Sequence, residues 1–244
     1  MSPTADSETP SAIERRTFLR RAGLGAATAG AVWAAPSITG FDAAFAGASC
    51  AREETLDWSS FANGFAFTSQ NYPAVPGYPA VTLTVTTTLV GTPNPSGINA
   101  TVQPGTFGSL PGKYYLLQAT PANANSGFNT TIAFTVPVFN VRFTLLDIDR
   151  QRFGGGDGWQ DRVWFDPAPA GISSVKNDPT RVFGAGTLAD PWTGQQNTNV
   201  ANGSPNGNVA ITIPTTSGVA LRYRAGNLLS VTQRIGIANI TFCR

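Results

Sequence analysis

The chain has 244 residues, of which 12% are charged, 41% are apolar and 10% are aromatic, with 26 glycines and 18 prolines. Globular proteins average about 25% charged residues, so this chain is unusually neutral. Its formal net charge of +2 gives no strong attraction to nucleic acid or to an anionic membrane. The chain contains no histidine, which excludes histidine-based catalytic triads and metal sites with histidine ligands.

The first segment has the pattern of an export signal. Arg15 and Arg16 precede Phe18 and Leu19, an uncharged stretch follows at 22–38, and small residues come after it. A basic start, an apolar middle and a small-residue cleavage site are typical of a secretory signal. A short buried helix is the alternative interpretation. The arginine pair resembles the twin-arginine export motif.

That resemblance implies a bacterial or archaeal protein that is exported already folded, with the twin-arginine translocase as its partner during export. We expect residues 1–48 to form the signal peptide and residues 49–244 to remain as a single domain. The expected location is secreted, periplasmic or at the cell envelope. No second apolar run of about 18 residues follows, so we expect no membrane span in the mature chain.

Two cysteines lie at opposite ends of the expected mature domain. Cys50 is near its start and Cys243 is the penultimate residue of the chain. In an oxidising compartment two cysteines indicate a disulfide, and two unpaired buried thiols are the alternative. The sequence therefore predicts a Cys50–Cys243 bridge that closes nearly the whole domain into one loop.

Alternating apolar and polar residues indicate strands along the mature chain. No helical period of useful length appears after residue 50. The expected strands are, in chain order, Leu56–Phe61, Val81–Val90, Tyr114–Gln118, Thr130–Val136, Val138–Asp147, Arg162–Phe165, Asn208–Ile213, Val219–Arg224 and Ile235–Phe242. Pro137 cannot donate a hydrogen bond to a central ladder, which indicates an edge or a bulge at that point. Short strands separated by turn clusters predict an all-β fold, an antiparallel β-sandwich of the jelly-roll type.

Acidic residues concentrate in one segment of this charge-poor domain. Asp147, Asp149 and Asp161 flank the glycine-rich run Gly154–Gly158, and Asp157 lies within it. On a strand, Asp147 and Asp149 would point to the same face, about 7 Å apart. A set of carboxylates suits calcium, which takes 6–8 oxygen ligands.

Two alternatives to calcium stay open for this segment. Arg150, Arg152 and Arg162 interleave with the carboxylates, so ion pairs and Asp-capped turns account for them equally well. An aspartate pair about 5–9 Å apart also fits a glycosidase, although neighbouring arginines would lower the pKa that a general acid needs.

Tryptophans in loops are the other candidate binding feature. Trp159 follows the glycine-rich run and Trp192 lies in a Pro-Trp-Thr-Gly segment, whereas Trp164 alternates with apolar residues in an expected strand. We expect Trp164 in the core. Exposed loop aromatics commonly serve recognition, including stacking on sugar rings, so Trp159 and Trp192 are the predicted ligand-binding residues. Burial against the sandwich edge is the alternative.

The segment from Phe139 to Phe165 resembles a pattern in secreted bacterial adhesin-type and lectin-like β-sandwich modules. In those modules a strand that ends in Asp-Ile-Asp is followed by a variable loop and an Asp-x-Val strand, here Asp147–Asp149 and Asp161–Val163. The resemblance implies a binding sandwich and brings no catalytic residue with it. The C-terminus has no sorting signal of the cell-wall-anchored adhesins.

The sequence therefore predicts an exported, non-catalytic binding protein whose partner is a glycan or a surface protein. Two other classes stay open, a polysaccharide hydrolase that uses an aspartate pair, and a structural protein of the envelope or matrix. An enzyme should hold its aspartates in a concave pocket, a binding module should show tryptophan beside them, and a structural protein should show neither.

Overall fold

The computed structural model describes residues 50–244 except for 92–94, 154–155, 196–199 and 227–231. Every strand pair in these residues is antiparallel. The strands are β1 (Glu53–Leu56), β2 (Ser69–Tyr72), β3 (Val81–Val90), β4 (Ser96–Pro104), β5 (Lys113–Thr120), β6 (Gly127–Leu146), β7 (Arg150–Phe153), β8 (Gly156–Phe165), β9 (Ser173–Lys176), β10 (Val182–Phe183), β11 (Trp192–Gly194), β12 (Val209–Ala225), β13 (Gln233–Ile237) and β14 (Ile240–Cys243). In this described part the helical elements are the 3₁₀ turns Trp58–Ser60 and Pro205–Gly207. None of its helices has the length and hydropathy needed to cross a membrane.

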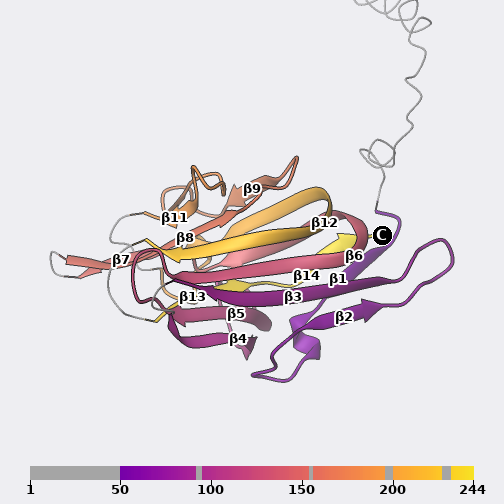
Figure 1. Cartoon of the computed structure of the whole chain (residues 1–244), viewed down its shortest axis with the longest axis horizontal. Coiled ribbons are helices and arrows are strands. Elements are labelled where there is room, and N and C mark those ends of the chain that lie inside the picture. The colour runs from indigo at the N-terminus through magenta and orange to yellow at the C-terminus, as the bar shows by residue number, and fades with distance from the viewer. Residues whose placement is uncertain (1–49, 92–94, 154–155, 196–199, 227–231) are drawn as a thin grey trace, which may run out of the picture. The chain divides into compact units, whose positions relative to one another are not determined.

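The two longest strands, β6 and β12, form a ribbon around which the fold is built. They pair from Val209 opposite Leu145 to Arg224 opposite Gly127. The first half of β6 also pairs with β3, whereas its second half pairs with β14 and β13. Likewise β12 pairs with β9 near its start and with β8 near its end. Since each long strand changes neighbours, the ribbon contributes to two layers, and the result is an antiparallel β-sandwich (Figure 1).

The ribbon changes layer at a bulge beside Pro137. The register between β12 and β6 shifts between Thr216 and Gly218, and a Cβ at Gly218 would lie 3.1 Å from the backbone oxygen of Ile132. A bulge tolerates a residue that has no N–H to donate and bends the strand. The expected bulge is therefore present, but β6 continues through Pro137 instead of dividing into two strands.

Apolar side chains from alternate positions of both layers fill the space between them. In β3 the inward residues Val81, Leu83 and Val85 are at most 3% exposed, and the threonines between them face outward or lie at the margin. Trp58 and Tyr223 are both fully buried, and Trp58 stacks on Tyr115 with ring centroids 5.1 Å apart. Burial of apolar area at about 25 cal/mol per Å² is the main force that holds the two layers together.

The ends of the domain are tied to each other in three ways. The predicted disulfide joins Cys50 to Cys243, with their Cα atoms 5.4 Å apart. Next to it, β1 pairs with β14 from Glu53 opposite Cys243 onward. The last residue, Arg244, is 9% exposed; it donates to Glu54 Oε1 at 2.5 Å and to the backbone oxygens of Pro73 and Pro79 at 2.8 Å.

Three strand predictions need correction. The expected first strand Leu56–Phe61 is only the end of β1 followed by a 3₁₀ turn, because Asp57 caps that turn by accepting from the Ser59 backbone N–H. The expected strand Ile235–Phe242 is two strands, β13 and β14, since Asn239 turns away to accept from the Trp58 backbone N–H at 3.0 Å. The expected strands Asn208–Ile213 and Val219–Arg224 are one, β12. The jelly-roll topology stays a prediction.

Candidate functional site

Three of the four predicted aspartates meet in one cavity. Asp147 and Asp149 follow the end of β6, and Asp161 lies in β8. All three line a cavity of about 350 Å³, and they are 4%, 6% and 1% exposed. Asp149, Trp159 and Asp161 place the cavity at the base of the β7–β8 hairpin. This hairpin extends from the end of the domain that is opposite to the C-terminus (Figure 1). The hairpin thus brings Asp161 back to Asp147 and Asp149.

Asp147 reaches the cavity in an unusual backbone conformation. The strand β6 ends at Leu146, and Asp147 has a φ of 65°. Residues with a side chain seldom adopt this left-handed region, although aspartate and asparagine tolerate it better than most. Asp147 and Asp149 therefore share the cavity without the strand alternation on which the sequence prediction was based.

Two glycines hold this strained segment in place. The Ile148 N–H donates to the Gly207 backbone oxygen at 2.9 Å, and a Cβ at Gly207 would lie 3.0 Å from the Asp147 Cα. A Cβ at Gly194 would lie 2.1 Å from the Asp149 carbonyl carbon. Side chains at these positions would force the segment outward, so the glycines allow the close approach that fixes both aspartates.

The carboxylates of Asp149 and Asp161 are tied into the fold through both of their oxygens. Asp149 Oδ1 accepts from Trp159 Nε1 at 2.7 Å, and its Oδ2 accepts from the Val200 backbone N–H at 3.1 Å. Asp161 Oδ2 accepts from the Asp149 backbone N–H at 3.0 Å, and its Oδ1 lies 2.6 Å from the Tyr223 hydroxyl. These two side chains therefore brace the base of the hairpin.

The Tyr223 hydroxyl joins Asp161 to Gln233, a second residue of the cavity lining. It lies 2.6 Å from Asp161 Oδ1 and 2.6 Å from Gln233 Oε1. A phenol has one proton to donate, so it cannot donate to both oxygens. Either Asp161 is protonated and donates to Tyr223, or the Gln233 amide is turned and donates its N–H to Tyr223. In both arrangements one polar atom of the Gln233 amide is left over.

The other lining residues come from segments far from the acidic cluster in sequence. Gln118 lies in β5, Gln233 and Arg234 lie in β13, and Asn202 and Thr232 lie in the connecting segments. The Arg234 guanidinium lies 5.7 Å from the centre of the Phe107 ring. The sequence prediction missed all of these lining residues, because polar residues at a strand start are common and only the pairing of β13 with β5 brings them here.

Burial and mutual repulsion favour the neutral form of the carboxyl groups. Burial is the main cause that raises the pKa of Asp147 to about 7, with a further rise from Asp149 and an opposing effect of Arg234. Burial also raises the pKa of Asp149 to about 6, against the hydrogen bonds from Trp159 and Val200. The pKa of Asp161 lies well above its usual value, first because of burial and then because of Asp149. Perturbed carboxyl groups gathered in a cleft are typical of functional sites.

The two predicted ligand-binding tryptophans have different positions. Trp159 is half-buried and lines the cavity beside Asp149. Trp192 is 0% exposed, packs edge-on against Phe165 with ring centroids 5.6 Å apart, and is covered by Gly186, where a Cβ would lie 2.3 Å from its ring. The prediction of an exposed ligand-binding Trp192 is therefore wrong, since this ring closes the core. Trp164, which we expected in the core, is 7% exposed.

The structure describes the side chains of three of the four predicted calcium ligands. Asp157 belongs to β8, but its side chain lies outside the described residues. In the described part of the chain, the one set of three acidic or cysteine ligand atoms within 4.8 Å of one another belongs to Cys50, Glu53 and Cys243, and the disulfide uses both sulfurs. Asp147, Asp149 and Asp161 thus do not form a three-carboxylate cage by themselves, and calcium binding stays a prediction.

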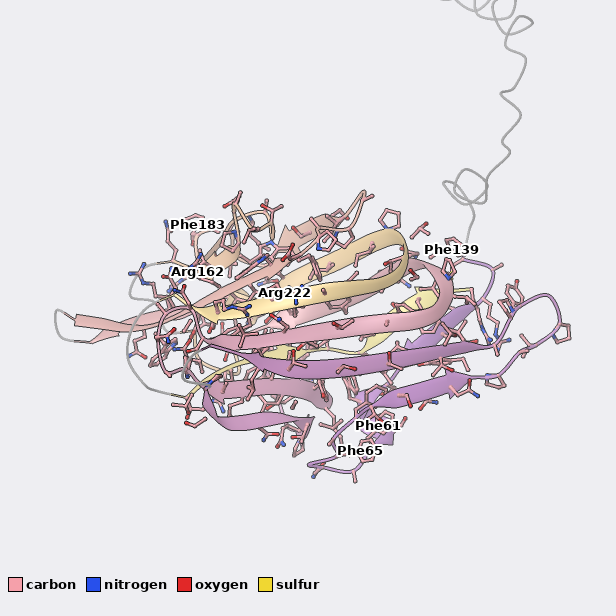
Figure 2. The ribbon with its side chains drawn as sticks, in the orientation of Figure 1. Phe61, Phe65, Phe139, Arg162, Phe183 and Arg222 are labelled. Carbon is pink, nitrogen blue, oxygen red and sulfur yellow. A yellow bond between two sulfur atoms is a disulfide. The ribbon has the colours of Figure 1, made fainter. Side chains whose placement is uncertain are left out.

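The positive charge that acts on the cavity comes from Arg234, which sequence analysis did not consider. It lowers the pKa of both Asp147 and Asp149. Arg162 follows Asp161 in β8, so its side chain leaves the sheet on the other face, where Figure 2 shows it at the surface. The side chain of Arg152 lies outside the described residues, as does the whole predicted export motif (Arg15, Arg16, Phe18 and Leu19).

A second aromatic feature lies outside the cavity. Phe61 and Phe65 stack with ring centroids 5.3 Å apart, and Phe65 is 43% exposed. Both lie in the segment between β1 and β2, near the margin of the domain (Figure 2). This pair presents apolar rings, whereas the cavity combines one indole with converging polar groups.

Comparison with protein-family models, curated proteins and solved structures finds no match. The cavity itself is therefore the feature that indicates a function. Its chemistry includes three carboxyl groups, one guanidinium, two glutamines and an indole. Such groups can exchange hydrogen bonds with a polar ligand and can cover one flat face of it.

Proposed function

We propose that this protein is an exported, non-catalytic binding protein that holds a carbohydrate in the cavity beside the β7–β8 hairpin. The observation that carries the proposal is the convergence of Asp147, Gln233 and Arg234 on a cavity that also contains the Trp159 indole. Export by the twin-arginine route and an adhesin-like role at or outside the cell envelope complete the proposal. They rest on the sequence of residues 1–48 and on the Asp-Ile-Asp pattern.

Size and lining both favour a sugar over a protein surface as the ligand. Small-molecule sites enclose about 300–1,000 Å³, and this cavity encloses about 350 Å³. Its nine lining residues all carry a polar group, and one of them is aromatic. Sugars offer hydroxyl groups at their edges and C–H groups on their faces, which match polar side chains and an indole respectively.

A polysaccharide hydrolase is the second candidate, and one observation favours it. Burial and the Asp149 charge raise the pKa of Asp147 to about 7, which suits a general acid near neutral pH. Against this, both oxygens of Asp149 and of Asp161 are hydrogen-bonded within the protein, so neither has the freedom of a nucleophile or base. Release of new reducing ends from any bound glycan would favour the hydrolase.

The test of binding is a glycan array with the purified, disulfide-intact protein, followed by titration of each hit. Trp159→Ala should weaken binding by at least tenfold, because stacking on the indole is lost. Phe65→Ala is the matched control, since it removes an exposed aromatic ring outside the cavity. Binding that tolerates Trp159→Ala but not Phe65→Ala would move the site to the Phe61–Phe65 pair. No binding to any glycan would leave the structural-protein alternative.

A further inference from the structure

We infer that the ligand is a neutral sugar or polyol and that two adjacent hydroxyl groups of it pair with the side chains of Asp147 and Gln233. This inference rests on the proposed function and makes it more specific. It assigns the selectivity of the cavity to these two lining residues. Asp149 and Asp161, whose carboxyl oxygens are hydrogen-bonded within the protein, serve as the frame.

Asp147 and Gln233 are lining residues that each have a buried polar atom available for a hydrogen bond to a ligand. Asp147 Oδ1 and Gln233 Nε2 are fully buried atoms without a hydrogen-bond partner among the described residues. Their side chains are 4% and 3% exposed, and both line the cavity. Leaving such atoms unpaired is costly, so they indicate where a ligand makes its hydrogen bonds.

A hydroxyl group is the ligand group that fits both positions in every arrangement of protons. Because the Tyr223 hydroxyl has only one proton, the Gln233 amide has either an N–H or its carbonyl oxygen left for a ligand. Asp147 likewise presents an acceptor when ionised, and a donor as well when protonated. A hydroxyl both donates and accepts, so it pairs with each of these. Two neighbouring hydroxyls on one sugar ring then pair with both side chains.

The charges around the cavity disfavour the two ionic ligand classes. An anion would meet three carboxyl groups, those of Asp147, Asp149 and Asp161, with Arg234 as the one described cation of the lining. A cation would be repelled by Arg234 and would need several carboxylate oxygens close together. The oxygens of Asp147, Asp149 and Asp161 do not form a set of three within 4.8 Å of one another. A neutral ligand avoids both penalties, because desolvating a charge is expensive unless it is paired.

The experiment compares ligand classes on the purified, oxidised chain at pH 7 with chelator present. The probes are the methyl glycosides of glucose, galactose and mannose, the matching uronic acids and the matching 2-amino-2-deoxy sugars, measured by calorimetry or ligand-observed NMR. We expect a neutral glycoside to bind best. Its deoxy analogue at either of two adjacent hydroxyls should bind at least tenfold more weakly, since a buried partner is then left unpaired.

Two substitutions at one position separate hydrogen bonding from charge. Asp147→Gly removes the side chain, and glycine accepts the φ of 65° found there without strain, so the variant should fold and bind the neutral glycoside at least tenfold more weakly. Asp147→Asn keeps a polar group that pairs with a hydroxyl, so binding should stay within about threefold of the native value. Gln233→Met should match Asp147→Gly, and Gln70→Met on β2 is the control for substitution of a glutamine.

Each result decides the question. Tighter binding of a uronic acid or an amino sugar, or loss of binding in Asp147→Asn, would overturn the neutral-ligand inference and leave the binding function standing. Unchanged affinity in both Asp147→Gly and Gln233→Met would do the same. If the native protein binds no carbohydrate in the glycan array or in the titrations, the proposed function fails, and the inference fails with it.

Discussion

Replacing Asp147 with asparagine is expected to make the stability of the protein less sensitive to pH. The pKa of Asp147 rises from the ordinary 3.8 to about 7, mainly through burial. The folded state therefore holds a proton that the unfolded state releases, and stability is lost as pH rises from about 4 to about 7. A difference of about 3 units at about 1.4 kcal/mol each gives an upper limit of about 4 kcal/mol at pH 8.

Asparagine has nearly the same shape, does not titrate and tolerates a positive φ. Urea unfolding in the presence of chelator, at pH 4 and pH 8, measures the effect. The variant should equal the native protein at pH 4 and be more stable at pH 8, where a gain of this size corresponds to about 10 °C in melting temperature. Asp190→Asn, at an exposed position, is the control. Parallel pH profiles of the Asp147→Asn and native proteins would refute the reasoning.

Three further predictions concern the disulfide, export and calcium. Cys50→Ser should lower the free energy of unfolding by up to about 5 kcal/mol because the bridge to Cys243 closes a loop of 193 residues, and thiol labelling of the denatured, unreduced native protein should detect no free thiol. Replacing Arg15 and Arg16 by lysines should leave the precursor in the cytoplasm, as fractionation would show; unchanged export would contradict the twin-arginine assignment. The calcium site predicted from the sequence requires that millimolar calcium raise the melting temperature of the native protein but not that of Asp149→Asn. The neutral-ligand inference instead expects equal melting curves with and without calcium, and that result would exclude the calcium site.

The strands that could be predicted are those in which one face is buried along the whole length. In β3, Val81, Leu83 and Val85 point into the core, so the alternation that favours a strand is present in the sequence, and the predicted bounds agree with the structure. The continuity of β6 and β12 was not predictable in the same way. Both strands contain a proline and a turn-like segment, and only their long mutual pairing keeps them extended through the bulge.

The acidic half of the candidate site could be predicted, and the other half could not. Asp147, Asp149 and Asp161 lie within fifteen residues of one another, so a hairpin was enough to bring them together. Gln118 and Gln233 join them only because β13 pairs with both β5 and β6, and nothing local in the sequence encodes that. The prediction of an exposed Trp192 was wrong for a related reason. The neighbouring proline and glycine indicate a loop, but they do not show whether the core has space for the ring.

The four aspartates of the sequence pattern do not have equal roles in the structure. Asp149 and Asp161 exchange backbone and side-chain hydrogen bonds, since the Asp161 N–H donates to the Asp149 backbone oxygen at 2.9 Å while Asp161 Oδ2 accepts from the Asp149 N–H at 3.0 Å. Asp147 has a strained φ and a buried oxygen without a partner among the described residues. Strain and an unpaired acceptor both reduce stability, and a role confined to the fold would be served as well by glycine. Their coincidence at one residue that lines the cavity is the physical reason to place ligand recognition at Asp147 and to assign the other two to its support.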